Sequence, residues 1–136
     1  MTEMLQKQSA PMVLVIDDDE FAREVLGEML SQLGVKEVLN ATDGRVALRV
    51  LAAQERAPDF VICDVFMPDM DGIEFLDHLA TQGFVGGIIM LSGVDANMLN
   101  LSKVIGSASG LRVLGTYTKP VSLEDLGRAM GLLQIS

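Results

Sequence analysis

Cysteine, histidine and aromatic residues are scarce in this 136-residue sequence, which has one Cys, one His, no Trp and 4% aromatics. The single Cys63 excludes an internal disulfide, and because it lies inside an apolar run we expect it to act as a small buried hydrophobe. His78 is expected on the polar side of a helix, which argues against chemistry that depends on histidine. With so few aromatics, Val, Leu, Ile and nine Met must fill the core.

Positive charge and long hydrophobic runs are scarce as well. Ten Lys and Arg stand against 19 Asp and Glu, giving a net charge of −9. This balance argues against nucleic acid or an anionic membrane as a direct partner. No apolar stretch reaches the roughly 18 residues that span a bilayer, and residues 1–10 lack the apolar run of a signal peptide. We therefore expect a cytoplasmic protein without membrane association.

Short apolar runs alternate with amphipathic segments along the rest of the chain. They predict strands at 12–16, 35–39, 60–63, 88–91 and 112–118, and helices that begin near 20, 43, 73, 95 and 122. Residues 1–10 are expected to be flexible, and residues 11–136 to form one domain. The alternation predicts a doubly wound parallel α/β sheet of five βα units with helices on both faces.

Two of the predicted helices carry informative details. In the first, Phe21, Val25, Met29 and Leu33 recur every four residues, so we expect this row to face the core and Gly34 to end the helix. In the last, Gly127 and Gly131 are each expected to cost the helix up to about 1 kcal/mol relative to Ala.

Polar residues follow four of the predicted strands at the point where each strand ends. Asp17 and Asp18 follow the first strand, Asp64 the third, Ser92 the fourth and Lys119 the fifth. Because the carboxyl ends of parallel strands meet at one edge of the sheet, we expect these side chains to form a site.

The chemistry of that site follows from its residue types. Three crowded carboxylates repel one another unless some protonate or a cation joins them, and oxygen ligands favour Mg²⁺. Ser92 offers a hydroxyl group and Lys119 a point charge suited to phosphate, while a carboxylate can act as a nucleophile. Together these residues predict a site that accepts a phosphoryl group on Asp64.

At this point the sequence resembles the receiver domain of two-component response regulators, the family that includes the chemotaxis regulator CheY. The resemblance covers Val13 to Leu133 and rests on the motifs Val-Ile-Asp-Asp, Asp-Val-Phe-Met-Pro-Asp-Met-Asp-Gly, Leu-Ser-Gly and Lys-Pro after the first, third, fourth and fifth strands. It implies a flavodoxin-like fold with strand order 2-1-3-4-5 and a cis Lys119–Pro120 bond.

The resemblance also implies roles for the site residues. Asp64 would take a phosphoryl group from a sensor histidine kinase, a phosphotransfer protein or a small donor. Asp18, Asp64 and the Phe66 carbonyl would hold Mg²⁺, with Asp17 acting mainly through water. Ser92 and Lys119 would contact the phosphoryl oxygens. The surface formed by the helix near 95–107, the fifth strand and the last helix would then change, and a downstream effector or a second copy of the chain would bind there.

Two features depart from the family pattern. The aromatic residue usual three positions before the lysine is replaced by Thr116, and Tyr117 follows on the opposite face of the strand. Ser92 and Lys119 are 27 residues apart, which exceeds the spacing in compact members. Longer versions of this region occur in receivers similar to those attached to cyclic-di-GMP phosphodiesterases.

Alternative functions remain open at the level of sequence. Asp17 and Asp19 form an Asp-x-Asp after the first strand, as in phosphatases of the haloacid-dehalogenase type, where Asp17 would be the nucleophile. A receiver fold used only for docking, without phosphorylation, is a third possibility. A nucleotide-binding Rossmann domain is disfavoured because no G-x-G-x-x-G follows the first strand.

Overall fold

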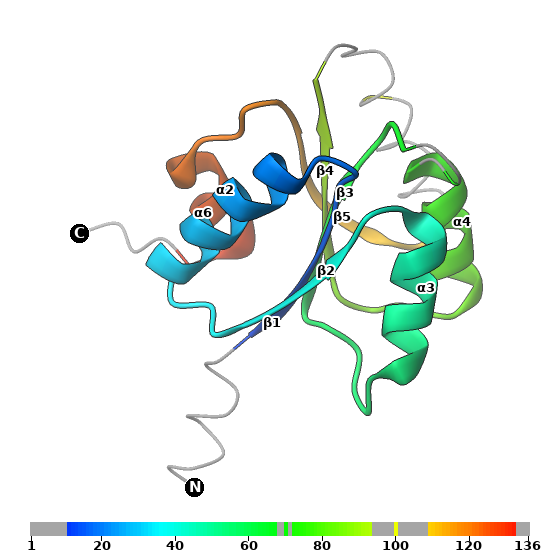
Figure 1. Ribbon diagram of the computed structural model, residues 1–136. Coiled ribbons are helices and arrows are strands. Elements are labelled where there is room, and N and C mark those ends of the chain that lie inside the picture. Colours follow the sequence, from blue (N-terminus) through cyan, green and yellow to red (C-terminus); the bar gives the residue numbers. More distant parts are fainter. Residues whose placement is uncertain (1–10, 68–69, 71, 94–99, 101–108, 133–136) are drawn as a thin grey trace, which may run out of the picture.

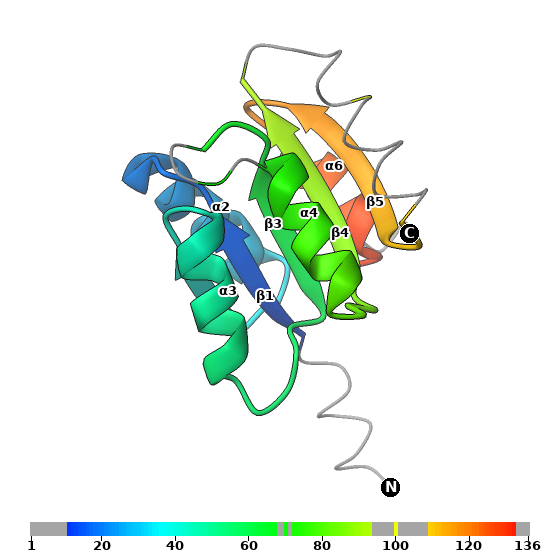
Figure 2. The ribbon, with the colours of Figure 1, turned by 90° about the vertical axis from the view of Figure 1, so that its right-hand side faces the viewer.

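The computed structural model describes residues 11–67, 70, 72–93, 100 and 109–132. Five parallel strands form one sheet in the order β2-β1-β3-β4-β5, which confirms the expected fold and strand order. Helices α2 and α6 lie on one face of the sheet and α3 and α4 on the other (Figures 1 and 2). In chain order the elements are β1 (Met12–Ile16), α2 (Glu20–Gln32), β2 (Glu37–Ala41), α3 (Gly44–Ala53), β3 (Phe60–Asp64), α4 (Gly72–Thr81), β4 (Gly87–Ser92), β5 (Arg112–Thr118) and α6 (Leu123–Met130).

The core consists of one apolar cluster on each face of the sheet. Strands β1 and β4 are buried along their whole length because helices cover both of their faces. Leu14, Cys63 and Met90 point toward α3 and α4, whereas Val15, Ile62 and Leu91 point toward α2 and α6. The alternation of side chains along inner parallel strands thus fills both layers and leaves the strand ends for polar residues.

Side chains and glycines define the helix ends. Asp19, Asp43 and Ser122 are N-caps whose side-chain oxygens accept hydrogen bonds from the backbone N–H groups of the first turns. Gly131 does not lie inside the last helix as expected. It is the C-cap of α6 at φ 69°, in the left-handed region that favours glycine, so it ends this helix.

The orientation expected for α2 is only partly correct, because Met29 and Leu33 pack against the core cluster on that face whereas Phe21 does not. Leu26 and Leu30 are its buried residues, whereas Phe21 is 70% exposed and Val25 only half-buried. In a helix of 3.6 residues per turn, each step of four residues rotates the side-chain direction by about 40° around the helix axis. The row that begins at Phe21 therefore starts outside the contact with the sheet.

Other boundaries differ in smaller ways. Strand β2 begins two residues later than expected, and β5 is only half-buried because it lies at the edge of the sheet. The segment 1–10 and the helix expected at 95–107 lie outside the described residues, so the division at residue 11 stays a prediction. Among the described helices, none has the length and apolar character needed to cross a membrane.

Candidate functional site

The register of the sheet brings the strand-end residues to one edge. Ile16 pairs with Cys63, so Asp17 and Asp64 follow on neighbouring strands. Ser92 ends β4, is fully buried, and accepts a 2.8 Å hydrogen bond from the Lys119 backbone N–H to its carbonyl oxygen. The sequence-predicted residues Asp17, Asp64, Ser92 and Lys119 therefore lie together at the carboxyl edge of the sheet.

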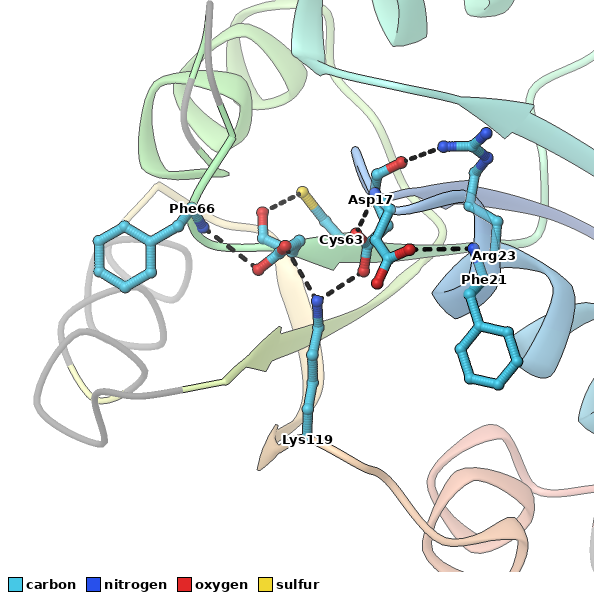
Figure 3. Close-up of polar contacts among 8 residues, drawn as sticks. Asp17, Phe21, Arg23, Cys63, Phe66 and Lys119 are labelled. Atoms are coloured by element: carbon cyan, nitrogen blue, oxygen red, sulfur yellow. Dashed lines mark hydrogen bonds and ion pairs between the residues drawn. The ribbon is translucent and has the colours of Figure 1, made fainter.

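Lys119 connects two of the carboxylates directly. Its Nζ donates to Asp17 Oδ2 at 2.6 Å and to Asp64 Oδ2 at 3.0 Å. Figure 3 shows the lysine side chain reaching up toward Asp17, with Phe66 on one side and Arg23 on the other. The Asp17 and Asp64 side chains are 1% and 8% exposed, so both ion pairs lie largely out of solvent. Charge-assisted hydrogen bonds of this kind are stronger than neutral ones.

Burial and charge shift the ionisation of this pair. Burial raises the pKa of Asp64, and Lys119, through its hydrogen bond and charge, only partly offsets that rise. For Lys119, burial alone lowers the pKa, but the hydrogen bonds and charges of Asp17 and Asp64 outweigh it, so the pKa is raised overall. Lys119 therefore keeps its positive charge at neutral pH, whereas the ionised form of Asp64 is disfavoured in this site.

The acidic residues fit a divalent cation in both geometry and chemistry. Carboxylate oxygens of Asp17, Asp18 and Asp64 all lie within 4.8 Å of one another, and Asp18 is exposed. This donor set contains only oxygen, as hard cations such as Mg²⁺ prefer. Phe66 lies two residues after Asp64, and its N–H donates to Asp64 Oδ1 at 3.3 Å. The Phe66 carbonyl as a cation ligand stays a prediction.

Arg23 is a site residue that the sequence reasoning missed. Arg23 is half-buried, and its Nη1 donates to the Asp17 carbonyl oxygen at 2.7 Å. Side chains on a helix lean toward its N-terminus, so an arginine in the second turn can reach back to the loop before it. Its position six residues after Asp17 was the available signal.

The backbone near Lys119 agrees with two expectations. The Lys119–Pro120 bond is cis. Tyr117 pairs with Leu91 and packs in the cluster under α2 and α6, whereas Thr116 pairs with Met90, which belongs to the opposite cluster. The only Tyr of the chain therefore lies on the face away from the position that Thr116 occupies.

Proteins of known function are similar to this chain in sequence over most of its length. The chain is 36% identical over 114 residues to the cyclic di-GMP phosphodiesterase RocR of Pseudomonas aeruginosa, covering 84% of this chain and 29% of RocR. It is 33% identical over 125 residues to the regulator of RpoS of Escherichia coli, covering 92% of this chain and 34% of that protein. The chain thus spans about a third or less of these curated relatives.

Among solved structures, the chemotaxis protein CheY4 of Vibrio cholerae superposes with a TM-score of 0.74 at 30% identity, covering 93% of this chain and 100% of that one. The fold and the acidic strand-end site thus define a doubly wound domain of the CheY-like class. The family model of the response regulator receiver domain matches residues 13–130, and the chain belongs to that family.

Proposed function

We propose that this receiver domain is a phosphorylation switch whose acceptor is Asp64. The observation that supports this best is the ion-paired arrangement in which Lys119 contacts the buried carboxylates of Asp17 and Asp64 while Asp18 stays exposed beside them. One lysine does not balance three carboxylates, so the site favours a divalent cation. Once the cation is bound, it and Lys119 can stabilise an anionic phosphoryl group.

The proposed reaction transfers a phosphoryl group to the Asp64 carboxylate. A carboxylate oxygen of Asp64 attacks phosphorus, a P–O bond forms, and the P–N bond of a donor phosphohistidine or the P–O bond of a small acyl phosphate breaks in line. The departing histidine or acid keeps the bonding electron pair. Lys119 then pairs with a phosphoryl oxygen, and the Ser92 hydroxyl donates to another.

The cation is expected to be Mg²⁺. Asp18, Asp64 and the Phe66 carbonyl would hold it, with Asp17 acting mainly through water, and when bound it would neutralise negative charge on the phosphoryl oxygens. The domain turns over no metabolite in this proposal and catalyses only the phosphorylation and dephosphorylation of its own aspartate.

The proposed donor is a sensor histidine kinase or a phosphotransfer protein. An apolar groove next to Lys119 supports a protein donor, because it opens beside the site and carries Phe21, 70% exposed, at its margin. Its lining residues on α2 and the β5–α6 connection include Val25, Met29, Pro120 and Val121. Downstream, an effector domain or protein would read the surface that includes β5 and α6, and the same surface could pair two copies of the chain.

The decisive experiment locates the covalent phosphate. After treatment with acetyl phosphate and Mg²⁺, borohydride trapping and peptide mass spectrometry should place the modification on Asp64, and Asp64→Asn should abolish it. Modification of Asp17 instead would favour the phosphatase of the haloacid-dehalogenase type. No uptake at any Mg²⁺ concentration would favour a docking module without phosphorylation.

A further inference from the structure

Arg23 holds the loop after β1 with both its backbone and its side chain. Its N–H donates to the Asp19 carbonyl oxygen at 3.1 Å, as an ordinary helix hydrogen bond, and its Nη1 donates to the Asp17 carbonyl oxygen at 2.7 Å. In the view of Figure 3, the guanidinium meets Asp17 from the side opposite Lys119. Asp18 lies in the chain between the two residues whose carbonyl groups Arg23 contacts.

Every polar atom of Asp17 has a hydrogen-bond partner in the chain. Its N–H donates to the Ala41 carbonyl oxygen at 3.1 Å. Its Oδ1 accepts from the Asp19 N–H at 2.9 Å, and its Oδ2 accepts from Lys119 Nζ at 2.6 Å. The remaining atom, the carbonyl oxygen, is the one that Arg23 contacts. Because Asp17 is only 1% exposed, loss of the Arg23 side chain would leave a buried carbonyl without its donor.

Asp18 is fixed less directly than Asp17. Its side chain is exposed, and within the part of the chain that the structure describes no residue donates a hydrogen bond to its carboxylate. One of its carboxylate oxygens nevertheless lies within 4.8 Å of oxygens of Asp17 and Asp64. Because a peptide unit is planar, the direction of the Asp17 carbonyl sets the plane that leads into the Asp18 backbone. The hydrogen bond from Arg23 therefore limits where the Asp18 carboxylate can lie.

We propose that Arg23 is a positioning residue for the cation site. It fixes the peptide between Asp17 and Asp18 so that the Asp18 carboxylate stays next to Asp64, and it acts through the backbone rather than by contact with the cation. This inference rests on the proposed function, in which Asp18 and Asp64 hold Mg²⁺. It adds that the affinity for the cation depends on an arginine outside the acidic cluster.

The positive charge of Arg23 makes the expected result distinctive. A guanidinium near three carboxylates repels an incoming divalent cation, so removal of its charge alone would strengthen Mg²⁺ binding. Loss of the hydrogen bond has the opposite effect, because ordering Asp18 when the cation arrives then consumes part of the binding free energy. The direction of the change in affinity therefore separates positioning from charge.

The test measures Mg²⁺ binding to the whole chain by calorimetry without a phosphodonor. Arg23→Ala should weaken binding by about tenfold, the low end of the effect of removing an outer-shell partner of a metal site. Arg45→Ala is the charge control. Arg45 is exposed in the first turn of α3, which begins at the same edge of the sheet, and its removal should leave binding unchanged or slightly tighter. Unchanged or tighter binding in Arg23→Ala overturns the inference.

Gly87→Ala separates positioning from a general loss of stability. Gly87 begins β4 at the amino-terminal ends of the strands, and a Cβ atom there would overlap the Leu114 side chain and lie 3.0 Å from Phe60 Cδ1. We expect overpacking to lower the stability of this variant, while the folded protein binds Mg²⁺ as the wild type does. A loss of affinity in folded Gly87→Ala as large as in folded Arg23→Ala would show that reduced stability is sufficient, and it would also overturn the inference.

The wild-type protein decides the underlying proposal separately. If it neither binds Mg²⁺ nor takes up a phosphoryl group from acetyl phosphate, the proposed function itself fails. If it does both while Arg23→Ala behaves like Arg45→Ala, only the positioning role fails.

Discussion

Lys119 and Asp17 form the shorter of the two ion pairs in the site, at 2.6 Å against 3.0 Å between Lys119 and Asp64. The Asp17 side chain is only 1% exposed, and its other oxygen, Oδ1, accepts a 2.9 Å hydrogen bond from the Asp19 backbone N–H. Lys119 therefore supplies the nearest positive charge to a carboxylate that solvent barely reaches. A buried carboxylate that loses its partner is costly, which leads to the first prediction.

Removing the lysine should destabilise the metal-free protein. Breaking a buried pair costs about 3–5 kcal/mol. Because a quarter of the Lys119 side chain is exposed, we expect Lys119→Ala to lower the free energy of unfolding by about 2 kcal/mol. Urea denaturation in EDTA measures this change. Lys36→Ala, at an exposed lysine before β2, is the control and should change stability by less than about 0.5 kcal/mol.

Mg²⁺ should stabilise the Lys119→Ala variant more than the wild type. Without the lysine, the carboxylates have no fixed counter-charge, so a cation gains more free energy on joining them. The same denaturation series with and without Mg²⁺ measures the difference. Equal stabilisation of both proteins would contradict a cation site that shares its carboxylates with Lys119.

Asp64→Asn should alter the dependence of stability on pH. The pKa of Asp64 is raised by burial in the folded state, so the folded protein binds a proton at pH values where the unfolded chain has lost it. The ionised Asp64 therefore lowers the free energy of unfolding. This loss is absent at pH values below the pKa of Asp64 in the unfolded chain, near the ordinary value of 3.8, and is complete above its raised pKa in the folded protein. The stability of Asp64→Asn relative to wild type should therefore grow as pH rises through that window.

The measurement is the difference in free energy of unfolding between the two proteins, in EDTA, from acid to neutral pH. Asp59→Asn is the comparison variant, because it removes a carboxylate outside the site. Asp59 lies at the amino-terminal ends of the strands, where its Oδ2 accepts a hydrogen bond from the Met12 N–H. An Asp64→Asn difference that shrinks with rising pH would show that Lys119 outweighs burial at this carboxylate.

Gly115→Ala should destabilise the fold through Tyr117. A Cβ atom at residue 115 would lie 2.6 Å from Tyr117 Cε2 and 2.7 Å from its Oη, so the ring occupies the space that a side chain would need. Overpacking typically costs about 1–3 kcal/mol, and we expect a loss in that range. Because the chain has no Trp and Tyr117→Leu removes its one Tyr, far-ultraviolet circular dichroism during urea unfolding measures the change in every variant. Adding Tyr117→Leu should recover part of the loss; no recovery would mean that the ring is not the obstacle.

Local patterns in the sequence predicted most of the fold, and the errors share a cause. The bounds of β1 and β5 were predicted correctly because apolar runs and turn residues define them locally. The clustering of Asp17, Asp64 and Lys119 followed from the parallel sheet, whose strand ends meet at one edge. The inward face of α2, by contrast, depends on how the helix docks on the sheet.

The contacts that the sequence did not predict connect residues that are distant along the chain or depend on backbone position. Arg23 reaches back across the first turn of α2, and Met70 lies against Gly44 at the start of α3. In both cases the residue type was compatible with a simpler role. An exposed arginine and a helix-start glycine need no special explanation until the neighbouring backbone is placed.

The exposure of Phe21 permits a test of the proposed protein donor. Because Phe21 is 70% exposed, Phe21→Ala should change stability by less than about 0.5 kcal/mol and leave phosphoryl uptake from acetyl phosphate unchanged. Transfer from a histidine phosphotransfer domain that phosphorylates the wild type should fall by about tenfold or more, as expected for a central aromatic contact. Val85→Ala is the control and should leave both reactions unchanged. The Val85 side chain is 77% exposed and precedes β4, so it lies at the amino-terminal ends of the strands, away from the site. A loss of both reactions in Phe21→Ala would place its effect on the acceptor site, and a loss of neither would remove the groove beside Lys119 from the donor interface.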